Sequence, residues 1–76
     1  MNIFRENKII KKVNEIIGWK LPKFAMGACG VCDEDGRIVV YVETSDGGVS
    51  AIDYELFLTK AVNGKVSKED FIECLC

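Results

Sequence analysis

Residues 24–43 form the stretch that most constrains the fold of this 76-residue chain. The stretch begins with small residues (FAMGACGVC), continues with DEDG and ends with RIVVYVE. The last segment is mostly β-branched and aromatic, and such residues fit a pleated sheet. The DEDG segment favours a tight turn in which Gly36 takes a positive φ. The pattern therefore predicts a β-hairpin.

The two strands of this hairpin differ in the side chains they offer. In the second strand, Ile38, Val40 and Val42 share one face, whereas Glu43 lies on the other face among apolar residues. This pattern predicts a central strand with one dry and one partly wet face. The first strand has little side chain on either face, which favours a bulge or the close approach of another element. We expect a helix to pack tightly over this thin patch.

An amphipathic helix is predicted before the hairpin, at residues 3–17. Its apolar residues Ile9, Val13 and Ile16 follow the i, i+4, i+7 spacing of a buried stripe, and charged residues lie outside that stripe. Gly18 is a typical residue to end a helix, so the residues after it are predicted to form a connection. We expect the stripe to face the core; the alternative is a helix that lies on a membrane or a partner.

Two further elements are predicted directly after the hairpin. A turn at residues 44–48 leads into a third strand at 49–52, and a helix follows at 54–62. Asp53 is a suitable N-cap for that helix, and Leu56 lies outside its apolar stripe. The predicted buried stripe is Tyr54, Phe57, Leu58 and Ala61.

A last helix is predicted to follow Ser67 as its N-cap and to contain the end of the sequence, with Phe71, Ile72 and Leu75 facing inward. The resulting order is α-β-β-β-α-α. It predicts a single small α+β domain over residues 1–76, with a three-stranded antiparallel meander and the helices packed on one face. A chain this short buries only about 60% of its unfolded surface, so a staple or a partner would add to its stability.

The composition is typical of a globular protein, with 49% hydrophobic and 29% charged residues. No apolar run approaches the roughly 20 residues that are needed to span a membrane. Arg5 and Lys8 interrupt the apolar segment that a signal peptide would need. The sequence therefore predicts a cytoplasmic protein without a membrane span, in which the thiols stay reduced.

The net charge of −2 is distributed unevenly along the chain. Residues 1–23 contain six basic and two acidic residues, a net charge of +4, whereas residues 24–76 contain four basic and ten acidic residues, a net charge of −6. Such asymmetry indicates either that the basic end binds an anionic partner or that the basic helix lies against the acidic remainder of the chain.

The sequence lacks the usual catalytic residue sets. It has no histidine, which removes the commonest general base and the Ser-His and Cys-His nucleophile pairs. No glycine-rich phosphate-binding motif is present. The three acids of the DEDG turn are adjacent, whereas paired catalytic carboxylates face each other in a concave site. We therefore predict that the protein is not an enzyme.

The cysteines form a CxxC motif, Cys29 and Cys32, and a CxC motif, Cys74 and Cys76. A zinc site with four cysteine ligands would join the two motifs and tie the last helix to the hairpin. Regular structure opposes this, because CxxC in a strand points its thiols to opposite faces and CxC in a helix separates them by about 200°. A redox motif would place CxxC at a helix N-terminus. We expect four free cysteines and no cofactor, with a zinc site as the alternative.

The predicted function is a small protein–protein interaction or regulatory module, such as an inhibitor, an adaptor or a self-associating protein. The alternative is a small domain stabilised by zinc on its four cysteines. Nucleic acid is not an expected partner, because the chain is acidic overall. We expect the lone tryptophan to cap one edge of the core; the alternative is an exposed anchor for a partner, since interface hot spots favour that residue. The candidate binding residues are Trp19, Lys11, Lys12, Asp33, Glu34, Asp35 and Leu56.

Overall fold

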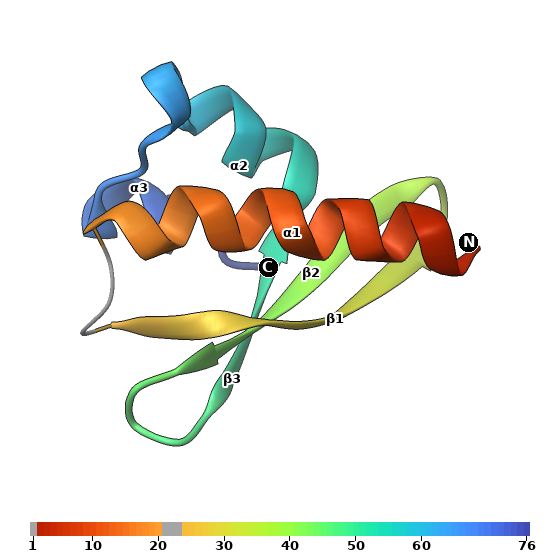
Figure 1. Ribbon diagram of the computed structural model, residues 1–76, viewed down its shortest axis with the longest axis horizontal. Coiled ribbons are helices and arrows are strands. Elements are labelled where there is room, and N and C mark those ends of the chain that lie inside the picture. Colours follow the sequence, from red (N-terminus) through yellow and green to blue (C-terminus); the bar gives the residue numbers. More distant parts are fainter. Residues whose placement is uncertain (1, 21–23) are drawn as a thin grey trace.

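The structure is a computed structural model that describes residues 2–20 and 24–76, without the side chains of residues 19 and 20. Its elements follow the order α-β-β-β-α-α and form a small α+β domain (Figure 1). They are α1 (Ile3–Lys20), β1 (Ala25–Glu34), β2 (Arg37–Thr44), β3 (Val49–Asp53), α2 (Tyr54–Lys60), the 3-10 turn η1 (Val62–Gly64) and α3 (Lys68–Glu73). The three strands form an antiparallel sheet with β2 at its centre, so the predicted element order and meander are confirmed.

The β1–β2 hairpin closes with a loop of two residues. Glu34 pairs with Arg37, and the two residues between them, Asp35 and Gly36, have φ values of 51° and 78°. Two consecutive positive φ values match the right-handed twist of the strands they join. The prediction for Gly36 is confirmed, and the turn is shorter than the whole DEDG segment.

Strand β1 contains two bulges within its run of small residues. Its pairing with β2 shifts between Ala25 and Gly27 and again between Ala28 and Gly30, and each shift adds one residue to β1. The Asn14 side chain of α1 reaches this region, because its Oδ1 accepts a hydrogen bond of 2.7 Å from the Ala28 amide. A Cβ atom at Gly27 would lie 3.3 Å from the same oxygen. A helix therefore packs closely on the thin patch, as the small residues predicted.

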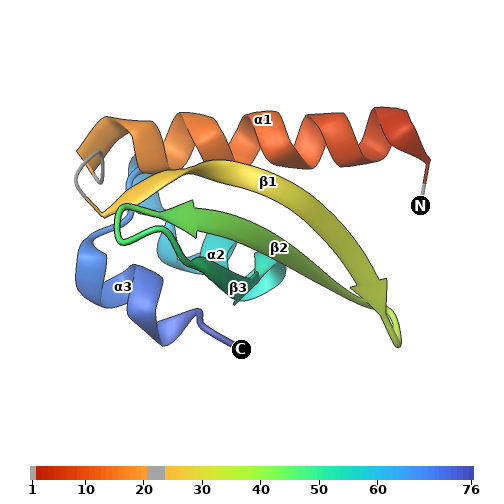
Figure 2. The same cartoon turned by 90° about the horizontal axis from the view of Figure 1, so that it is seen from below.

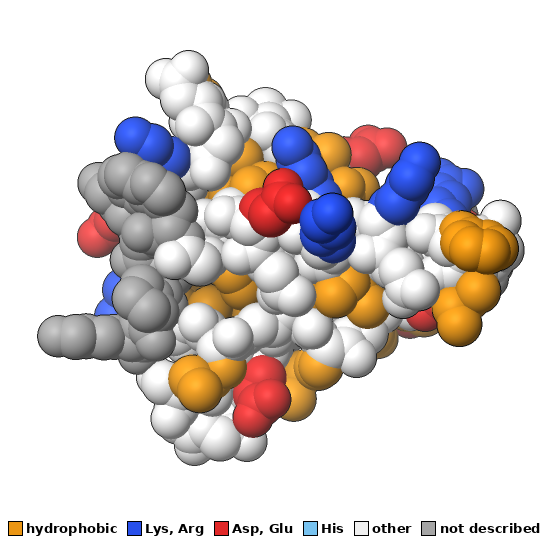
Figure 3. Space-filling view, viewed as in Figure 1, with side chains coloured by type: hydrophobic (Ala, Val, Ile, Leu, Met, Phe, Trp, Pro, Cys, Tyr) orange, Lys and Arg blue, Asp and Glu red, His pale blue; other side chains and the backbone are white. Residues whose placement is uncertain are grey.

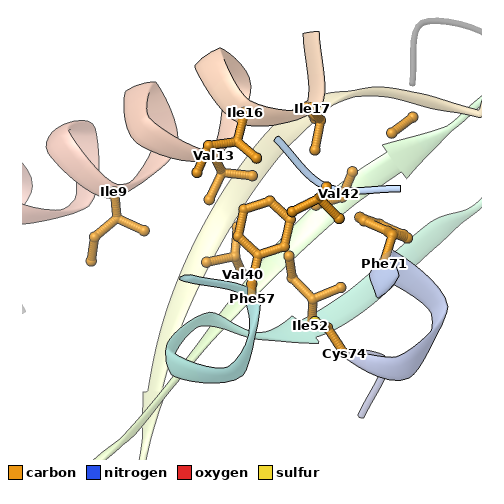
Figure 4. Packing of buried hydrophobic residues seen from close by; sticks show 12 residues of the cluster. Ile9, Val13, Ile16, Ile17, Val40, Val42, Ile52, Phe57, Phe71 and Cys74 are labelled. Atoms are coloured by element: carbon orange, nitrogen blue, oxygen red, sulfur yellow. The ribbon is translucent and has the colours of Figure 1, made fainter. Parts of the chain in front are cut away.

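The core joins the sheet to all three helices (Figure 4). Val40 and Val42 of β2 and Ile52 of β3 are fully buried in one cluster with helical side chains. The other labelled members in Figure 4 are Ile9, Val13, Ile16, Ile17, Phe57, Phe71 and Cys74. In Figure 2, β2 and β3 lie in front of α2. Helix α2 therefore lies behind these two strands in that view.

The N-terminal helix is longer than predicted. It continues through Gly18 to Lys20, so Gly18 is not its C-terminal cap and Trp19 belongs to the helix and not to a connection. A cap of that type needs a glycine in the left-handed region, and Gly18 is not among the residues with positive φ. A helical glycine costs only about 1 kcal/mol relative to alanine, and the buried Ile16 and Ile17 hold the preceding turn against the core.

The C-terminal helices have the predicted N-caps. The Asp53 side chain accepts a hydrogen bond from the Leu56 amide, and Ser67 Oγ accepts one from the Asp70 amide, each at 3.1 Å. The helices themselves are shorter than predicted. The first ends at Lys60, and Asn63 just after it has a φ of 59°, which is not helical.

Three predicted core positions of these helices are wrong. Leu58, Ile72 and Leu75 are 38%, 47% and 41% exposed, whereas Cys74 is buried. The cause near the end of the chain is a change of secondary structure after Glu73. The Asp53 amide donates to the Cys74 carbonyl and the Cys76 amide donates to the Ala51 carbonyl, both at 2.9 Å. The last residues therefore pair with β3 and do not continue the helical periodicity.

Candidate functional site

The side of α1 that faces away from the core carries the most distinctive surface of the molecule. Lys8 and Lys11 lie on it, and Arg5 and Lys12 lie along one of its edges; we call these four exposed cations the basic face. Figure 3 shows basic side chains along this helix and hydrophobic atoms at its N-terminal end. Two large hydrophobic side chains are exposed at that end, Ile3 at 67% and Phe4 at 79%.

Helical geometry explains why these residues share a side. Phe4, Lys8 and Lys11 are spaced i, i+4, i+7 and lie opposite the buried stripe that contains Ile9 and Val13. The stripe holds the helix on the sheet, and the regular period leaves the opposite side free. The same helix carries two acids, so the basic face is cationic but not uniformly so.

The basic face is not neutralised by the rest of the domain. In the described part of the chain, the ion pairs are Arg37 with Asp53, at 3.4 Å, and Lys60 with Glu73, at 2.6 Å. Neither pair includes a residue of α1. The basic helix does lie against the acidic remainder of the chain, since its apolar stripe packs on the sheet, but these four cations form no ion pair with it in the described residues.

The β1–β2 turn carries a second charged surface. Asp33, Glu34 and Asp35 are all exposed, and we call them the acidic tip. A shallow hollow of about 280 Å³ is lined by Glu34, Asp35 and Arg37. All three lining residues are exposed, and the Arg37 guanidinium is paired with Asp53 on β3. The acidic tip is therefore a solvated surface.

The remaining candidate binding residues lie apart from any assembled site. Leu56 is 37% exposed on α2, as its position outside the apolar stripe predicted. The side chain of Trp19 lies outside the described part of the structure, so its predicted role as an anchor stays a prediction. Lys11 and Lys12 belong to the basic face.

The thiols do not converge on one point. Cys29 Sγ lies 3.5 Å from the Tyr41 carbonyl oxygen, whereas Cys32 Sγ lies 3.7 Å from Glu34 Oε1. Cys74 is buried and its Sγ donates to the Asp70 carbonyl at 3.2 Å. Among the described residues, no group of three Cys, Asp or Glu side chains is placed to hold a metal ion. Cys29, Cys32, Cys74 and Cys76 are thus not brought together as the predicted zinc alternative requires.

The electrostatic surroundings also disfavour thiolate chemistry. Desolvation raises the pKa of Cys32, and the neighbouring Glu34 carboxylate raises it further. Burial likewise raises the pKa of Cys74. Reactive cysteines have lowered pKa values because the thiolate is the nucleophile. The two thiols are therefore protonated near neutral pH, and the CxxC motif lies in a strand and not at a helix N-terminus.

Only part of the basic face was predicted from the sequence, and that prediction came from the charge asymmetry of the chain. It named Lys11 and Lys12 but did not include Arg5, Lys8 or Phe4 among the binding residues. The signal was present, since the spacing of Phe4, Lys8 and Lys11 repeats the period of the buried stripe on the opposite side of the helix. The helical period therefore predicts Phe4 and Lys8 beside Lys11, whereas Arg5 is four residues before the buried Ile9 and its exposure is seen only in the structure.

These features define a small α+β domain whose most prominent surfaces are two charged patches of opposite sign. No protein family model, curated protein or solved structure matches this chain. Within the described residues, no helix combines the length and the apolar character that crossing a membrane requires.

Proposed function

We propose that this chain is a small non-enzymatic interaction module that binds an acidic surface of another protein through the basic face of α1. The observation that supports the proposal is that Arg5, Lys8, Lys11 and Lys12 are exposed and form no ion pair within the described part of the chain. Charges of this kind steer association and select partners of opposite sign. An inhibitor or an adaptor would act by occupying such a partner surface.

The composition of the exposed side favours a protein partner over a membrane. A helix that lies in a membrane interface inserts an apolar face. The apolar stripe of α1 is already buried in the core. Among the side chains of the helix that the structure describes, Ile3 and Phe4 are the exposed large apolar ones outside that stripe. One exposed aromatic side chain beside cations resembles the anchor-and-rim arrangement of protein interfaces.

The overall charge disfavours nucleic acid. A protein that binds the phosphate backbone needs a net attraction to it, and this chain has a net charge of −2 with the acidic tip at one end of its sheet. A protein surface with a few acids around an apolar contact fits the basic face better than a continuous polyanion.

A photo-crosslinking side chain at position 4 tests this proposal. The full-length chain carrying the crosslinker in place of Phe4 would be irradiated in lysate of its source cells at physiological salt. We expect discrete crosslinked products whose yield falls at least about tenfold when Lys8 and Lys11 are both replaced by Glu, because the contact depends on charge of the correct sign. The same crosslinker in place of Val49, which is 60% exposed on β3, is the matched control.

The mass of each product then identifies the kind of partner. Products that form equally from positions 4 and 49, or that persist after the charge reversal, would overturn the proposal. Far-UV circular dichroism of the charge-reversed chain checks that α1 is still folded.

A further inference from the structure

The basic face and the acidic tip lie at the same end of the molecule. Figures 1 and 2 are related by a rotation about the long axis, and in both the N-terminus of α1 and the β1–β2 turn lie at the same end of that axis. Asp33, Glu34 and Asp35 form no ion pair within the described part of the chain, as is also true of the cations of the basic face. The domain therefore presents two uncompensated surfaces of opposite sign near one end.

We propose that the partner of the basic face is a second copy of this chain, whose acidic tip docks against it while the reciprocal contact forms on the other side of a two-fold axis. This inference rests on the proposed function and names its partner. In a two-fold interface, residue i of one copy contacts residue j of the other and residue j contacts residue i. Two complementary patches at one end of a molecule satisfy this condition.

The charge distribution favours a second copy over an unrelated acidic protein. The first 23 residues have a net charge of +4 and the remaining 53 a net charge of −6, so each chain contains both members of a complementary pair. A reciprocal contact would pair both patches at once, whereas a purely acidic partner would leave the acidic tip facing like charge. Association would also cover Ile3 and Phe4, which are 67% and 79% exposed.

The contact would be weak and sensitive to salt. Exposed ion pairs are individually weak, so we expect a dissociation constant on the order of 0.1 mM at low salt. We expect it to weaken at least about tenfold between about 0.025 M and about 0.3 M salt, because the Debye length shortens over that range.

Charge-swapped variants of the full chain provide the test. In one variant Lys8, Lys11 and Lys12 are replaced by Glu, so that the basic face becomes net acidic like the tip. In the other Asp33 and Glu34 are replaced by Lys, so that the tip becomes net basic like the face. Asp35 is left unchanged because its φ of 51° suits Asp better than Lys. Sedimentation equilibrium would measure the mass of each variant and of their equimolar mixture. Reducing conditions prevent disulfides between copies, because Cys29 and Cys76 are exposed.

We expect each variant alone to be monomeric and the mixture to form a heterodimer with an affinity within about threefold of the parent dimer, because both reciprocal contacts are restored with reversed sign. The matched control replaces the exposed Glu43 and Glu55 by Lys. It changes the net charge by the same amount as the replacement of Asp33 and Glu34, but away from the acidic tip. This control should dimerise about as well as the parent if the location of the charge decides the contact.

Three results would overturn the inference. They are a parent chain that stays monomeric at about 1 mM in low salt, variants that dimerise alone as well as the parent, and a mixture that stays monomeric. A charge-dependent crosslink from position 4 to a protein of another mass would then still support the proposed function. The absence of any such crosslink would count against the function itself.

Discussion

The helices of this domain form two parts, α1 and the pair α2 and α3, and the two parts are attached to the sheet in different ways. α1 has 18 residues and buries Ile9, Val13, Ile16 and Ile17, which lie one or two turns apart and are at most 5% exposed. α2 and α3 have seven and six residues, and each buries a single phenylalanine, Phe57 or Phe71. The long helix distributes its burial over several aliphatic side chains, whereas each short helix depends on one ring.

This difference follows from the length that a helix needs to be stable. Helices shorter than about 12–15 residues are marginal in water even with favourable sequences. α2 and α3 therefore depend on their N-caps and on the contacts of their rings. The rings of Phe71 and Phe57 meet edge to face with centroids 6.4 Å apart, and Phe71 also meets Phe24 at 5.4 Å. α1 needs no such concentrated contact, so its outer side remains available for binding.

The largest expected effect is that of replacing Phe71 by Ala. Phe71 is fully buried and contacts two other rings, so its loss leaves a cavity that the six-residue α3 cannot fill. We expect a loss of about 3–5 kcal/mol in the free energy of unfolding, measured by urea denaturation. The same substitution at Phe4, which is 79% exposed, should change that free energy by less than about 0.5 kcal/mol.

The milder change Phe71→Leu keeps the measurement possible if the alanine variant does not fold. It should lower the free energy of unfolding by less than the alanine variant does, about 1–2 kcal/mol. Equal effects of the alanine substitutions at positions 71 and 4 would show that the ring cluster does not hold the C-terminal helices.

The next largest effect is expected at the N-caps, where the same kind of cap is present on a short helix and on a long one. Ser67 Oγ accepts from the Asp70 amide at 3.1 Å, and Asn2 Oδ1 accepts from the Arg5 amide at 2.9 Å. We expect Ser67→Ala to cost about 1 kcal/mol of unfolding free energy. Asn2→Ala should cost less than about 0.5 kcal/mol, because the first turn of α1 is exposed and can fray without disturbing the buried stripe.

Thermal unfolding of both variants, with Ser45→Ala as a surface control, measures this difference. Ser45 is exposed, so its substitution should leave the unfolding free energy within about 0.5 kcal/mol of the parent. If the two cap substitutions cost the same, helix length does not set the dependence on caps, and the comparison between the two helical parts fails.

The contrast between the helices also explains which parts of the fold could be predicted from the sequence. The stripe of α1 repeats over several turns, so its period identified Ile9, Val13 and Ile16 as buried, and they are. In the C-terminal helices, each with two turns or fewer, the same reasoning placed Leu58 and Ile72 inside, and both are exposed. A short helix samples too little of the period to fix which side is buried.

Other features depend on contacts that no local pattern contains. The extended pairing after Glu73 forms only because the edge of β3 lies beside it, with hydrogen bonds at Asp53 and Ala51. The bulge sites in β1 are set by its register with β2. The small residues there predicted a bulge or a close contact, and both are present, but they could not show that Asn14 makes that contact.

The candidate site was predictable in outline and not in extent. The charge asymmetry identified α1 and the acidic tip, and the exposure of Leu56 was correctly predicted. Whether the cations of α1 are paired with acids elsewhere in the chain is a property of the tertiary structure, so the sequence left both alternatives open. The structure shows that α1 lies on the sheet and that the four described cations of the basic face form no ion pair with it, and an anionic partner stays a proposal.

The smallest expected effect concerns the β2–β3 turn, which is hydrogen-bonded to the residue before β1. The Ser45 amide donates to the Phe24 carbonyl at 3.0 Å, and Phe24 packs on Phe71. The Asp46 carboxylate accepts from the Thr44 hydroxyl at 2.6 Å and from the Gly48 amide at 2.9 Å. The Thr44 bond, with the Gly48 bond as a second cause, lowers the pKa of Asp46.

A lowered pKa in the folded state has a definite consequence for stability. The unfolded chain then binds a proton at higher pH than the folded chain does, so the contribution of Asp46 is fully present above its unfolded pKa and is lost as the pH falls through its folded pKa. The melting temperature of the parent should fall as the pH is lowered from neutral to acidic. In the Asp46→Asn variant we expect this fall to be smaller. The change should be small because Asp46 is exposed.

Two substitutions at Thr44 test whether its hydroxyl is the cause. Thr44→Ser keeps the donor and should leave the pH dependence close to that of the parent. Thr44→Val removes the donor, so the pH dependence should shift toward that of Asp46→Asn, with a remaining part from the Gly48 amide. If Thr44→Val keeps the full pH dependence of the parent, the hydroxyl is not what lowers the pKa of Asp46. The Gly48 amide would then be the bond that lowers it.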